Sequence, residues 1–310
     1  MGIESLLPPL KPESLQCINR LQRHVCPSQA RRFPRRRSAA VAVILFVGRL
    51  GDLYVLLSTR AGNMRTYAHD TALPGGKYEE GDVDAEGTAR REAYEEIGLP
   101  MDREKVRLLC TLGPFLTGNS LIVTPVILLI TDHTLVPLLN PSEVQSLFSM
   151  PLSAFLHSRP SSIPSFHYRI SHRLSSIPSW VIDSIPPPPE VRYAEDNGVV
   201  GGKEGGYYGY RDVSWGEGKV RMHRFLTGRE ALGVKPVYGL TAAILIRVAT
   251  IGYDTAPDFA VLAPGQKKMQ DRIAHEITAV NGPLWRAVEA EDLLEEWMDR
   301  SGSAKVKAKL

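Results

Sequence analysis

The sequence contains few cysteines and no long apolar run. Its longest apolar stretches, 39–47 and 121–130, fall well short of the ~20 residues that a membrane-spanning helix requires, so both predict buried strands. The 3 cysteines are neither even in number nor spaced as metal ligands, which argues against a small disulfide-held domain and against a cysteine-ligated metal site. We therefore expect the chain to work in a reducing compartment.

A large excess of one charge sign is also missing. Lys and Arg number 37 against 34 Asp and Glu, a net charge of +3. Residues 1–40 hold eight basic and two acidic residues (+6), which leaves −3 for the rest of the chain. No broad basic face follows, and we expect no nucleic-acid partner. The basic first 37 residues resemble a transit peptide but lack the apolar segment and cleavage site of a secretory signal. Glu4 and Glu13 argue against a mitochondrial presequence.

Local patterns predict a mixed α/β (α+β) chain. Strands at 39–47 and 53–59 predict a hairpin, because Gly51-Asp52 supplies the turn. A helix is predicted over 85–97, where Gly98 follows as a left-handed cap. The other expected elements are a weak helix within 14–30, strands at 108–116, 121–131 and 135–139, a helix over 237–249, and one or two helices in 268–298.

Residues 160–218 differ from the rest in composition. They are rich in Pro, Gly and Ser and predict a long insertion, either a disordered spacer or a lid. Four aromatic residues in this region are expected to fold back onto the domain: Tyr207, Tyr208, Tyr210 and Trp215.

Three carboxylates share one face of the helix predicted over 85–97. Glu92, Glu95 and Glu96 stand at positions i, i+3 and i+4, which are neighbours on a helix surface. Like charges at this distance are unfavourable unless a cation joins them, and carboxylate oxygens favour Mg²⁺ or Mn²⁺. A solvated acidic helix face is the alternative interpretation. Arg91 is expected to project away from this face and to tie the helix to the preceding acidic loop.

From Gly76 to Leu99 the sequence resembles the Nudix box, in which a glycine and an acidic loop precede Arg-Glu-aliphatic-any-Glu-Glu-any-Gly-aliphatic. Every fixed position from Arg91 to Leu99 matches, with Ala93 as the aliphatic residue. The loop before Arg91 is one residue longer than in the common box. The acid that pairs with Arg91 therefore stays open among Asp82, Asp84 and Glu86.

The longer loop and the residues around it resemble the coenzyme A diphosphatase branch of the Nudix hydrolases. That branch has Leu-Leu-Thr-any-Arg, an arginine five residues on, and then Phe-Pro-Gly-Gly. The corresponding residues here are Leu56-Leu57-Ser58-Thr59-Arg60, Arg65 and Leu73-Pro74-Gly75-Gly76. His69 takes the place of a family glycine, which puts the local backbone conformation in question. Asn140-Pro141-Ser142-Glu143-Val144 and Tyr238-Gly239-Leu240-Thr241-Ala242 also look like segments of this branch.

The resemblance implies a Nudix fold, a mixed β-sheet sandwiched between helices. It also suggests three parts of the chain: a basic N-terminal extension with a weak helix (1–37), a Nudix hydrolase domain interrupted by the insertion (38–265), and C-terminal helices with a tail (266–310). If the insertion is a lid, Tyr207, Tyr208 and Trp215 would form it over the pantetheine arm of coenzyme A.

The implied reaction is metal-dependent hydrolysis of the diphosphate of coenzyme A and its derivatives to 4′-phosphopantetheine and adenosine 3′,5′-bisphosphate. Glu92, Glu95 and Glu96 would hold Mg²⁺ or Mn²⁺, and Glu92, Arg91 and Glu95 would form the catalytic group. The substrate would be bound by Arg60, Arg65, Gly75 and Gly76.

Three questions stay open from the residues. The general base is Glu92 or an acid outside the box such as Glu143, for which a carboxylate at a helix N-terminus is the alternative reading. The substrate could be another nucleoside diphosphate derivative, such as a dinucleotide. The chain could also be a non-catalytic binding module, although the intact carboxylates weigh against this.

The last three residues, Ala308-Lys309-Leu310, differ from the peroxisomal tripeptide Ser-Lys-Leu only by alanine for serine. They predict recognition by the peroxisomal import receptor and a peroxisomal location, with mitochondrion or cytoplasm as the alternatives.

Overall fold

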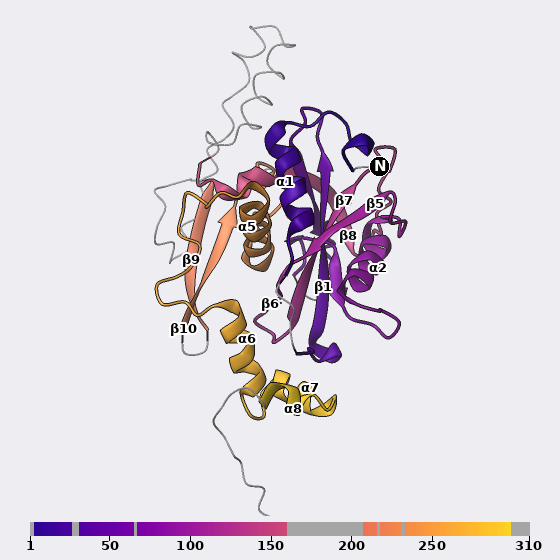
Figure 1. The fold of residues 1–310 in the computed structure, drawn as a ribbon. Coiled ribbons are helices and arrows are strands. Elements are labelled where there is room, and N and C mark those ends of the chain that lie inside the picture. Colours follow the sequence, from indigo (N-terminus) through magenta and orange to yellow (C-terminus); the bar gives the residue numbers. More distant parts are fainter. Residues whose placement is uncertain are drawn as a thin grey trace, which may run out of the picture.

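The computed structural model describes residues 3–26, 31–64, 67–159, 207–215, 218–230 and 233–298. A mixed β-sheet lies between helices, as the sequence predicts. Figure 1 shows helix α2 (Ala85–Ile97) on one side of this sheet and helices α1 (Pro12–Arg23) and α5 (Gly239–Tyr253) on the other. None of the helices among these residues is long and apolar enough to cross a membrane.

The main sheet has the strand order β3-β2-β1-β7-β5. Strands β1 and β7 run parallel at its centre, and the other neighbouring pairs are antiparallel. Shorter strands extend it, with β4 paired to β1, β6 to β7 and β8 to β2. The strands are β1 (Ser38–Val47), β2 (Leu53–Arg60), β3 (Thr71–Ala72), β4 (Gly75–Lys77), β5 (Val106–Thr111), β6 (Phe115–Leu116), β7 (Ile122–Ile130) and β8 (Val144–Pro151).

Strand β1 shows how the two faces of the sheet are filled. Successive side chains of a strand point to opposite faces. Val43 and Leu45 therefore belong to the core shared with α1 and α5. Ala42 and Ile44 belong to the smaller cluster under α2. Because both faces are covered, the strand is apolar throughout, which explains the long apolar run in the sequence.

The predicted hairpin and the predicted box helix are both confirmed. Strands β1 and β2 pair through a turn in which Gly51 has a φ of 79°. Helix α2 begins after Asp84, whose side chain accepts a hydrogen bond from the backbone N–H of Gly87. It ends at Gly98 with a φ of 66°, the left-handed cap that the sequence predicts.

The strand predicted at 135–139 is wrong. The backbone N–H of Leu138 donates to the carbonyl of Ile97, and that of Asn140 donates to the carbonyl of Glu96. These N–H groups bind the last carbonyl groups of α2, so they are not available to pair with a neighbouring strand. The apolar residues Leu135 and Leu139 pack against the cluster under α2, so the segment is apolar without being a strand.

Other predicted boundaries shift. The first helix ends at Arg23, and residues 24–26 continue without regular structure. The helix predicted over 237–249 starts at Gly239, because Val237–Tyr238 forms the short strand β11. The stretch 268–298 contains three helices, α6 (Met269–Thr278), α7 (Pro283–Ala290) and α8 (Leu294–Met298). Short 3₁₀ turns complete the described part: η1 (Ile3–Leu6), η2 (Arg35–Arg37) and η3 (Leu152–Leu156).

The end of the predicted insertion is regular structure. Strands β9 (Tyr208–Trp215) and β10 (Gly218–Phe225) form an antiparallel hairpin that β11 extends. Tyr207 is buried in the main core, and its ring lies 5.7 Å from that of Phe225. Tyr207 lies in the main core, Tyr208 packs against that core and Trp215 packs against the cluster of the C-terminal helices, which confirms the expectation for these three residues. Residues 160–206 lie outside the described part of the chain.

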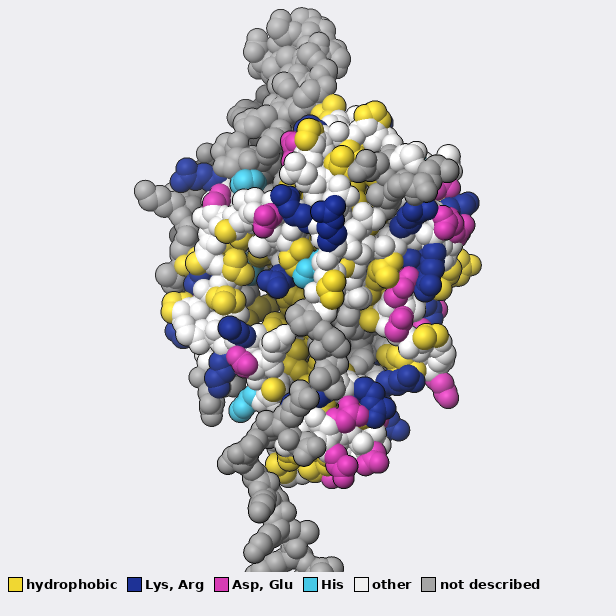
Figure 2. Space-filling view, in the orientation of Figure 1, with side chains coloured by type: hydrophobic (Ala, Val, Ile, Leu, Met, Phe, Trp, Pro, Cys, Tyr) yellow, Lys and Arg dark blue, Asp and Glu magenta, His cyan; other side chains and the backbone are white. Residues whose placement is uncertain are grey.

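The ends of the described chain pack onto the sheet. In α1, Cys17, Ile18 and Leu21 are fully buried in the main core. Helices α6, α7 and α8 form a separate cluster with β6. The division into three parts stays a prediction. On the face shown in Figure 2, basic and acidic side chains are interspersed.

Candidate active site

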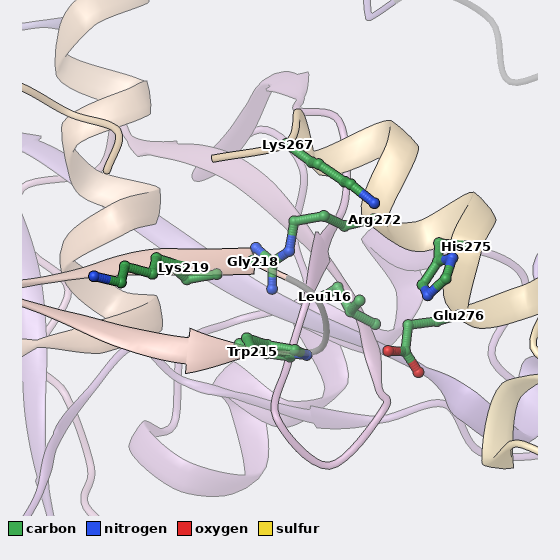
Figure 3. Close-up of a pocket in the computed structure, with 9 residues that line it drawn as sticks. Leu116, Trp215, Gly218, Lys219, Lys267, Arg272, His275 and Glu276 are labelled. Atoms are coloured by element: carbon green, nitrogen blue, oxygen red, sulfur yellow. The ribbon is translucent and has the colours of Figure 1, made fainter. Parts of the chain in front are cut away.

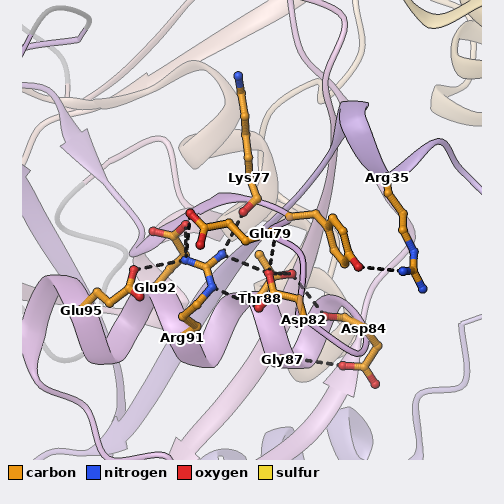
Figure 4. A network of polar contacts seen from close by, with 11 residues as sticks. Arg35, Lys77, Glu79, Asp82, Asp84, Gly87, Thr88, Arg91, Glu92 and Glu95 are labelled. Carbon is orange, nitrogen blue, oxygen red and sulfur yellow. Dashed lines mark hydrogen bonds and ion pairs between the residues drawn. The ribbon is translucent and has the colours of Figure 1, made fainter. Parts of the chain in front are cut away.

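The loop before α2 is tied to the helix by Arg91 (Figure 4). Arg91 Nε and Nη2 each donate to the Asp82 carboxylate at 3.0 Å, and Nη2 also donates to the Lys77 carbonyl at 2.9 Å. Asp84 instead caps α2, and Glu86 pairs with Arg90 at 2.7 Å. Asp82 is therefore the partner of Arg91, which the sequence left open.

Asp82 is held as a buried carboxylate. Its side chain is 5% exposed. Burial raises its pKa, but the hydrogen bonds from Arg91, from the backbone N–H of Glu79 and from the Thr88 hydroxyl outweigh burial and hold the pKa of Asp82 below its ordinary value. The same hydrogen bonds with Asp82 raise the pKa of Arg91.

Arg91 also reaches the acidic face of α2. Its Nη1 donates at 3.1 Å to both Glu92 and Glu95. The expectation that Arg91 projects away from this face is wrong, because a guanidinium has five donors in a planar fork and serves both sides at once. Arg91 therefore links the loop acid to two of the three candidate metal ligands (Figure 4).

Glu96 is the buried member of the three carboxylates. It is 6% exposed. Burial, the neighbouring charge of Glu92 and that of Glu143 raise its pKa to about 8, against a backbone hydrogen bond from Gly75 and the charge of Arg60. Burial also raises the pKa of Glu92, with Glu95 and Glu143 adding to this effect. Glu95 lies further out, with 49% of its side chain exposed.

The donor set fits a divalent cation. Among the residues that the structure describes, no three His, Cys, Asp or Glu side chains already enclose a metal position. However, the charges of Glu92 and Glu143 raise the pKa of Glu96, and those of Glu95 and Glu143 raise the pKa of Glu92. A neighbouring cation relieves such repulsion. All of these donors are carboxylate oxygens, the ligands that Mg²⁺ and Mn²⁺ prefer.

Two glycines let strand β4 approach this face. A Cβ on Gly76 would collide with the Glu92 carboxylate, and a Cβ on Gly75 would collide with the backbone of Ala40 and Val41 in β1. Position 75 therefore requires glycine because backbone lies in the way, and glycine at position 76 leaves room for the Glu92 carboxylate where it stands. The result is a backbone segment lying directly against the carboxylates of α2.

A cavity of about 450 Å³ opens beside this segment. Arg60, Gly75 and Gly76 line it, so three of the four predicted substrate-binding residues meet here. Arg60 Nε is buried and has no hydrogen-bond partner among the described residues. Arg65 lies outside the described residues.

Further residues complete the site. Glu143 directly precedes strand β8, so the reading of Glu143 as a helix N-terminal carboxylate is wrong. Its charge acts on both Glu92 and Glu96. His69 has a φ of 62°, so the backbone at this position takes the left-handed conformation that glycine adopts more readily than histidine.

The sequence provided no signal for one wall of the cavity. Asp70 lines it and accepts hydrogen bonds from Tyr238 and from Lys235, at 2.6 Å for Lys235. Tyr238 lies in a segment with a recognisable pattern, whereas Asp70 is a single acid in an irregular loop. These contacts join residues more than 160 positions apart, so no local pattern could predict them.

Comparison with known proteins identifies the family. A family model described as NUDIX domain matches residues 35–174. The chain is 33% identical over 155 residues to an uncharacterized Nudix hydrolase, NudL, of Photorhabdus laumondii, covering 49% of this chain and 75% of that protein. This chain is a member of the Nudix hydrolase family. The segment from Gly76 to Leu99 is accordingly its Nudix box.

Other Nudix relatives are longer. The chain is 34% identical over 236 residues to "Nudix hydrolase 15, mitochondrial" of Arabidopsis thaliana, covering 75% of this chain and 64% of that protein. It is 36% identical over 146 residues to "Peroxisomal coenzyme A diphosphatase 1, peroxisomal" of Saccharomyces cerevisiae, covering 39% of this chain and 43% of that protein. The chain thus spans less than two thirds of the length of these two relatives.

Proposed function

We propose that this Nudix protein hydrolyses the diphosphate of coenzyme A and its derivatives, with Mg²⁺ or Mn²⁺, to 4′-phosphopantetheine and adenosine 3′,5′-bisphosphate. The observation that carries the proposal is the carboxylate face of α2 lying against Gly75 and Gly76, at the edge of a cavity of about 450 Å³. The similarity to a yeast protein named as a coenzyme A diphosphatase supports this substrate.

We assign each side chain a role from its position in the site. Glu92, Glu95 and Glu96 would hold the metal, which polarises phosphoryl oxygens and lowers the pKa of water when bound. Arg91 keeps Glu92 and Glu95 in place by linking them to Asp82. Arg60 presents a guanidinium to a phosphate in the cavity.

Two acids are suited to take the proton of the attacking water. The charges of Glu92 and Glu143 both act on Glu96, which supports a place for both acids near the proposed metal. A pH–rate profile of Glu143→Gln distinguishes them. If Glu143 is the base, the variant loses the acidic limb of the profile while keeping its affinity for metal.

The deciding experiment incubates the purified protein with coenzyme A and Mg²⁺ or Mn²⁺ and identifies products by mass. Adenosine 3′,5′-bisphosphate is expected. A substrate panel that includes dinucleotides tests the alternative substrate class. If a dinucleotide is cleaved and coenzyme A is not, the proposed substrate is wrong.

We expect Glu96→Gln to lower this activity by a factor on the order of 100 or more, because a metal ligand that neutralises phosphoryl charge is lost. The free energy of unfolding should change little, because the pKa of Glu96 is raised to about 8 and glutamine resembles the protonated acid. Glu104→Gln is the matched control, because the Glu104 side chain is 83% exposed, pairs with Arg107 and does not line the cavity. Full activity of Glu96→Gln would contradict the metal site.

We also propose a peroxisomal location through the import receptor. The support is the Ala308-Lys309-Leu310 ending, which lies outside the described residues, and the peroxisomal name of the yeast relative. The Arabidopsis relative is named mitochondrial. Microscopy of a fluorescent fusion with and without the last three residues decides between these locations.

A further inference from the structure

A buried arginine lies outside the Nudix box and lines the same cavity as the residues of β4. Arg272 on α6 is 9% exposed. Its guanidinium carbon stands 4.3 Å from the centre of the Trp215 ring, at the end of β9. Its Nη1 lies 4.0 Å from the Met269 sulfur. Figure 3 shows the guanidinium directed from α6 toward the β9–β10 hairpin.

Among the described residues, this guanidinium forms no ion pair, and one of its nitrogens is left without a partner. Arg272 Nη2 is buried and has no hydrogen-bond partner among the residues that the structure describes. Burial lowers the pKa of Arg272, and the charge of Glu276, one turn further along α6, opposes this effect. An aromatic ring and a thioether do not replace a carboxylate, so the buried cation is unfavourable until an anion joins it.

Arg272 is buried between two neighbouring hollows, the smaller of which is lined by basic side chains and by Glu276. Arg272 lines the cavity of about 450 Å³ together with Arg60, Gly75 and Gly76. It also lines an adjoining hollow of about 30 Å³, to which Lys267 and His275 contribute. Figure 3 shows these two side chains on the α6 side of the hollow. The same cavity is therefore lined both by Gly76 of the Nudix box and by the guanidinium of Arg272.

We propose that Arg272 forms a second anion subsite, which takes a phosphate monoester on the nucleoside part of the substrate. The inference deepens the proposed function and rests on it, since coenzyme A carries a 3′-phosphate besides its diphosphate. The forked donors of a guanidinium bind two phosphate oxygens at once. Trp215 holds the guanidinium plane from one side, which orients Nη2 before the phosphate arrives.

Calorimetric titration without added metal tests the subsite independently of hydrolysis. The ligands are adenosine 3′,5′-bisphosphate, adenosine 5′-monophosphate and inorganic phosphate. The wild type should bind the bisphosphate about tenfold or more tightly than the monophosphate, as a charge-assisted contact predicts. Arg272→Gln should bind both nucleotides with the affinity of the monophosphate.

Two further variants control for folding and for general charge. Arg272→Met places an apolar side chain of similar length in the buried position, and it should fold and lose the same preference. Lys219→Gln removes one positive charge from a side chain that lines the hollow but points away from Arg272 in Figure 3. This control should keep the wild-type preference.

Three results would overturn the inference. The wild type could show no preference for the bisphosphate, or Arg272→Gln and Arg272→Met could keep it. Inorganic phosphate could also bind at Arg272 as tightly as the bisphosphate, which would assign the subsite to free phosphate instead of substrate.

A rate measurement separates this inference from the proposed function. If coenzyme A and its 3′-dephospho form are cleaved equally well by the wild type, the proposed function holds and the Arg272 subsite fails. If neither is cleaved while the titration shows the Arg272-dependent preference, the proposed reaction fails and the phosphate subsite stands.

Discussion

At the scale of single residues, Arg91 shows how one side chain organises the site. It joins Asp82 in the loop to Glu92 and Glu95 on α2. A lysine has no fork and could not serve these three carboxylates in the same way. The arginine in the box is therefore explained by its geometry as well as by its charge.

His223 makes stability depend on pH. Its Nε2 donates to the Val261 carbonyl at 3.0 Å and its Nδ1 accepts from the Tyr208 hydroxyl at 2.9 Å, which the neutral ring satisfies. Burial lowers the pKa of His223 to about 4 from an ordinary 6.5. Between these values the unfolded chain binds the proton and the folded chain does not, so stability falls as the pH falls from 6.5 to 4.

We expect this effect to amount to about 3 kcal/mol across that range, and His223→Gln should remove it. Urea unfolding at pH 7 and pH 4.5 measures the difference. His133→Gln is the control, because His133 is exposed and should leave the pH dependence unchanged. A pH dependence that is equal in wild type and His223→Gln would refute the assignment.

At the scale of elements, helix α2 and strand β4 illustrate two kinds of predictability. The start and end of α2 follow from Asp84 and Gly98, which act within a few residues of themselves. Strand β4 has only three residues, so its own sequence does not predict it. It forms because it pairs with β1. Gly75 faces β1 and Gly76 faces Glu92.

We expect the two glycines of β4 to respond differently to alanine. Gly75→Ala should lower the free energy of unfolding by about 1–3 kcal/mol, because its Cβ would push against the backbone of β1. Gly76→Ala should change stability by less than ~1 kcal/mol, because the Glu92 carboxylate is the flexible end of a side chain and can move away. That movement should lower metal-dependent hydrolysis about tenfold or more.

Urea unfolding and hydrolysis rates, measured on the same preparations, test this pair. Gly87→Ala in α2 is the control, since its Cβ would meet other atoms only at ordinary contact distances, from 3.7 Å. Full activity of Gly76→Ala would show that hydrolysis does not depend on the position of the Glu92 carboxylate against Gly76.

At the scale of the whole molecule, the N-terminal helix belongs to the main core. Helix α1 packs against α5, and Gly252 of α5 has no room for a Cβ beside Cys17. The helix that precedes the first strand by 14 residues therefore helps to hold α5, whose other end lines the cavity of about 450 Å³.

Leu21→Ala should lower the free energy of unfolding by about 2–5 kcal/mol, because it leaves a cavity between α1 and the rest of the core. Val25→Ala should cost less than ~0.5 kcal/mol, since Val25 is 83% exposed. Denaturant midpoints of both variants measure this. Equal midpoints would show that α1 is attached too loosely to share the core.

Predictions from the sequence succeeded where local signals agree. The first hairpin has a turn and two apolar runs, and α2 has a cap at each end. The predictions failed at 135–139, where the backbone donors serve the end of α2. They also missed the regular hairpin that ends the insertion, because Gly209 and Gly218 masked its alternating pattern.

The order of residues in the box determined which side chains share one face of α2. It also determined that these side chains are carboxylates, the type of ligand that suits a divalent metal. Only the tertiary structure decided which acid holds Arg91, that Glu143 stands beside Glu96, and that Arg272 shares a cavity with Gly76. The physical reason is distance along the chain. Helix and turn patterns act over a few residues, whereas these contacts arise when strands and helices far apart in sequence pack together.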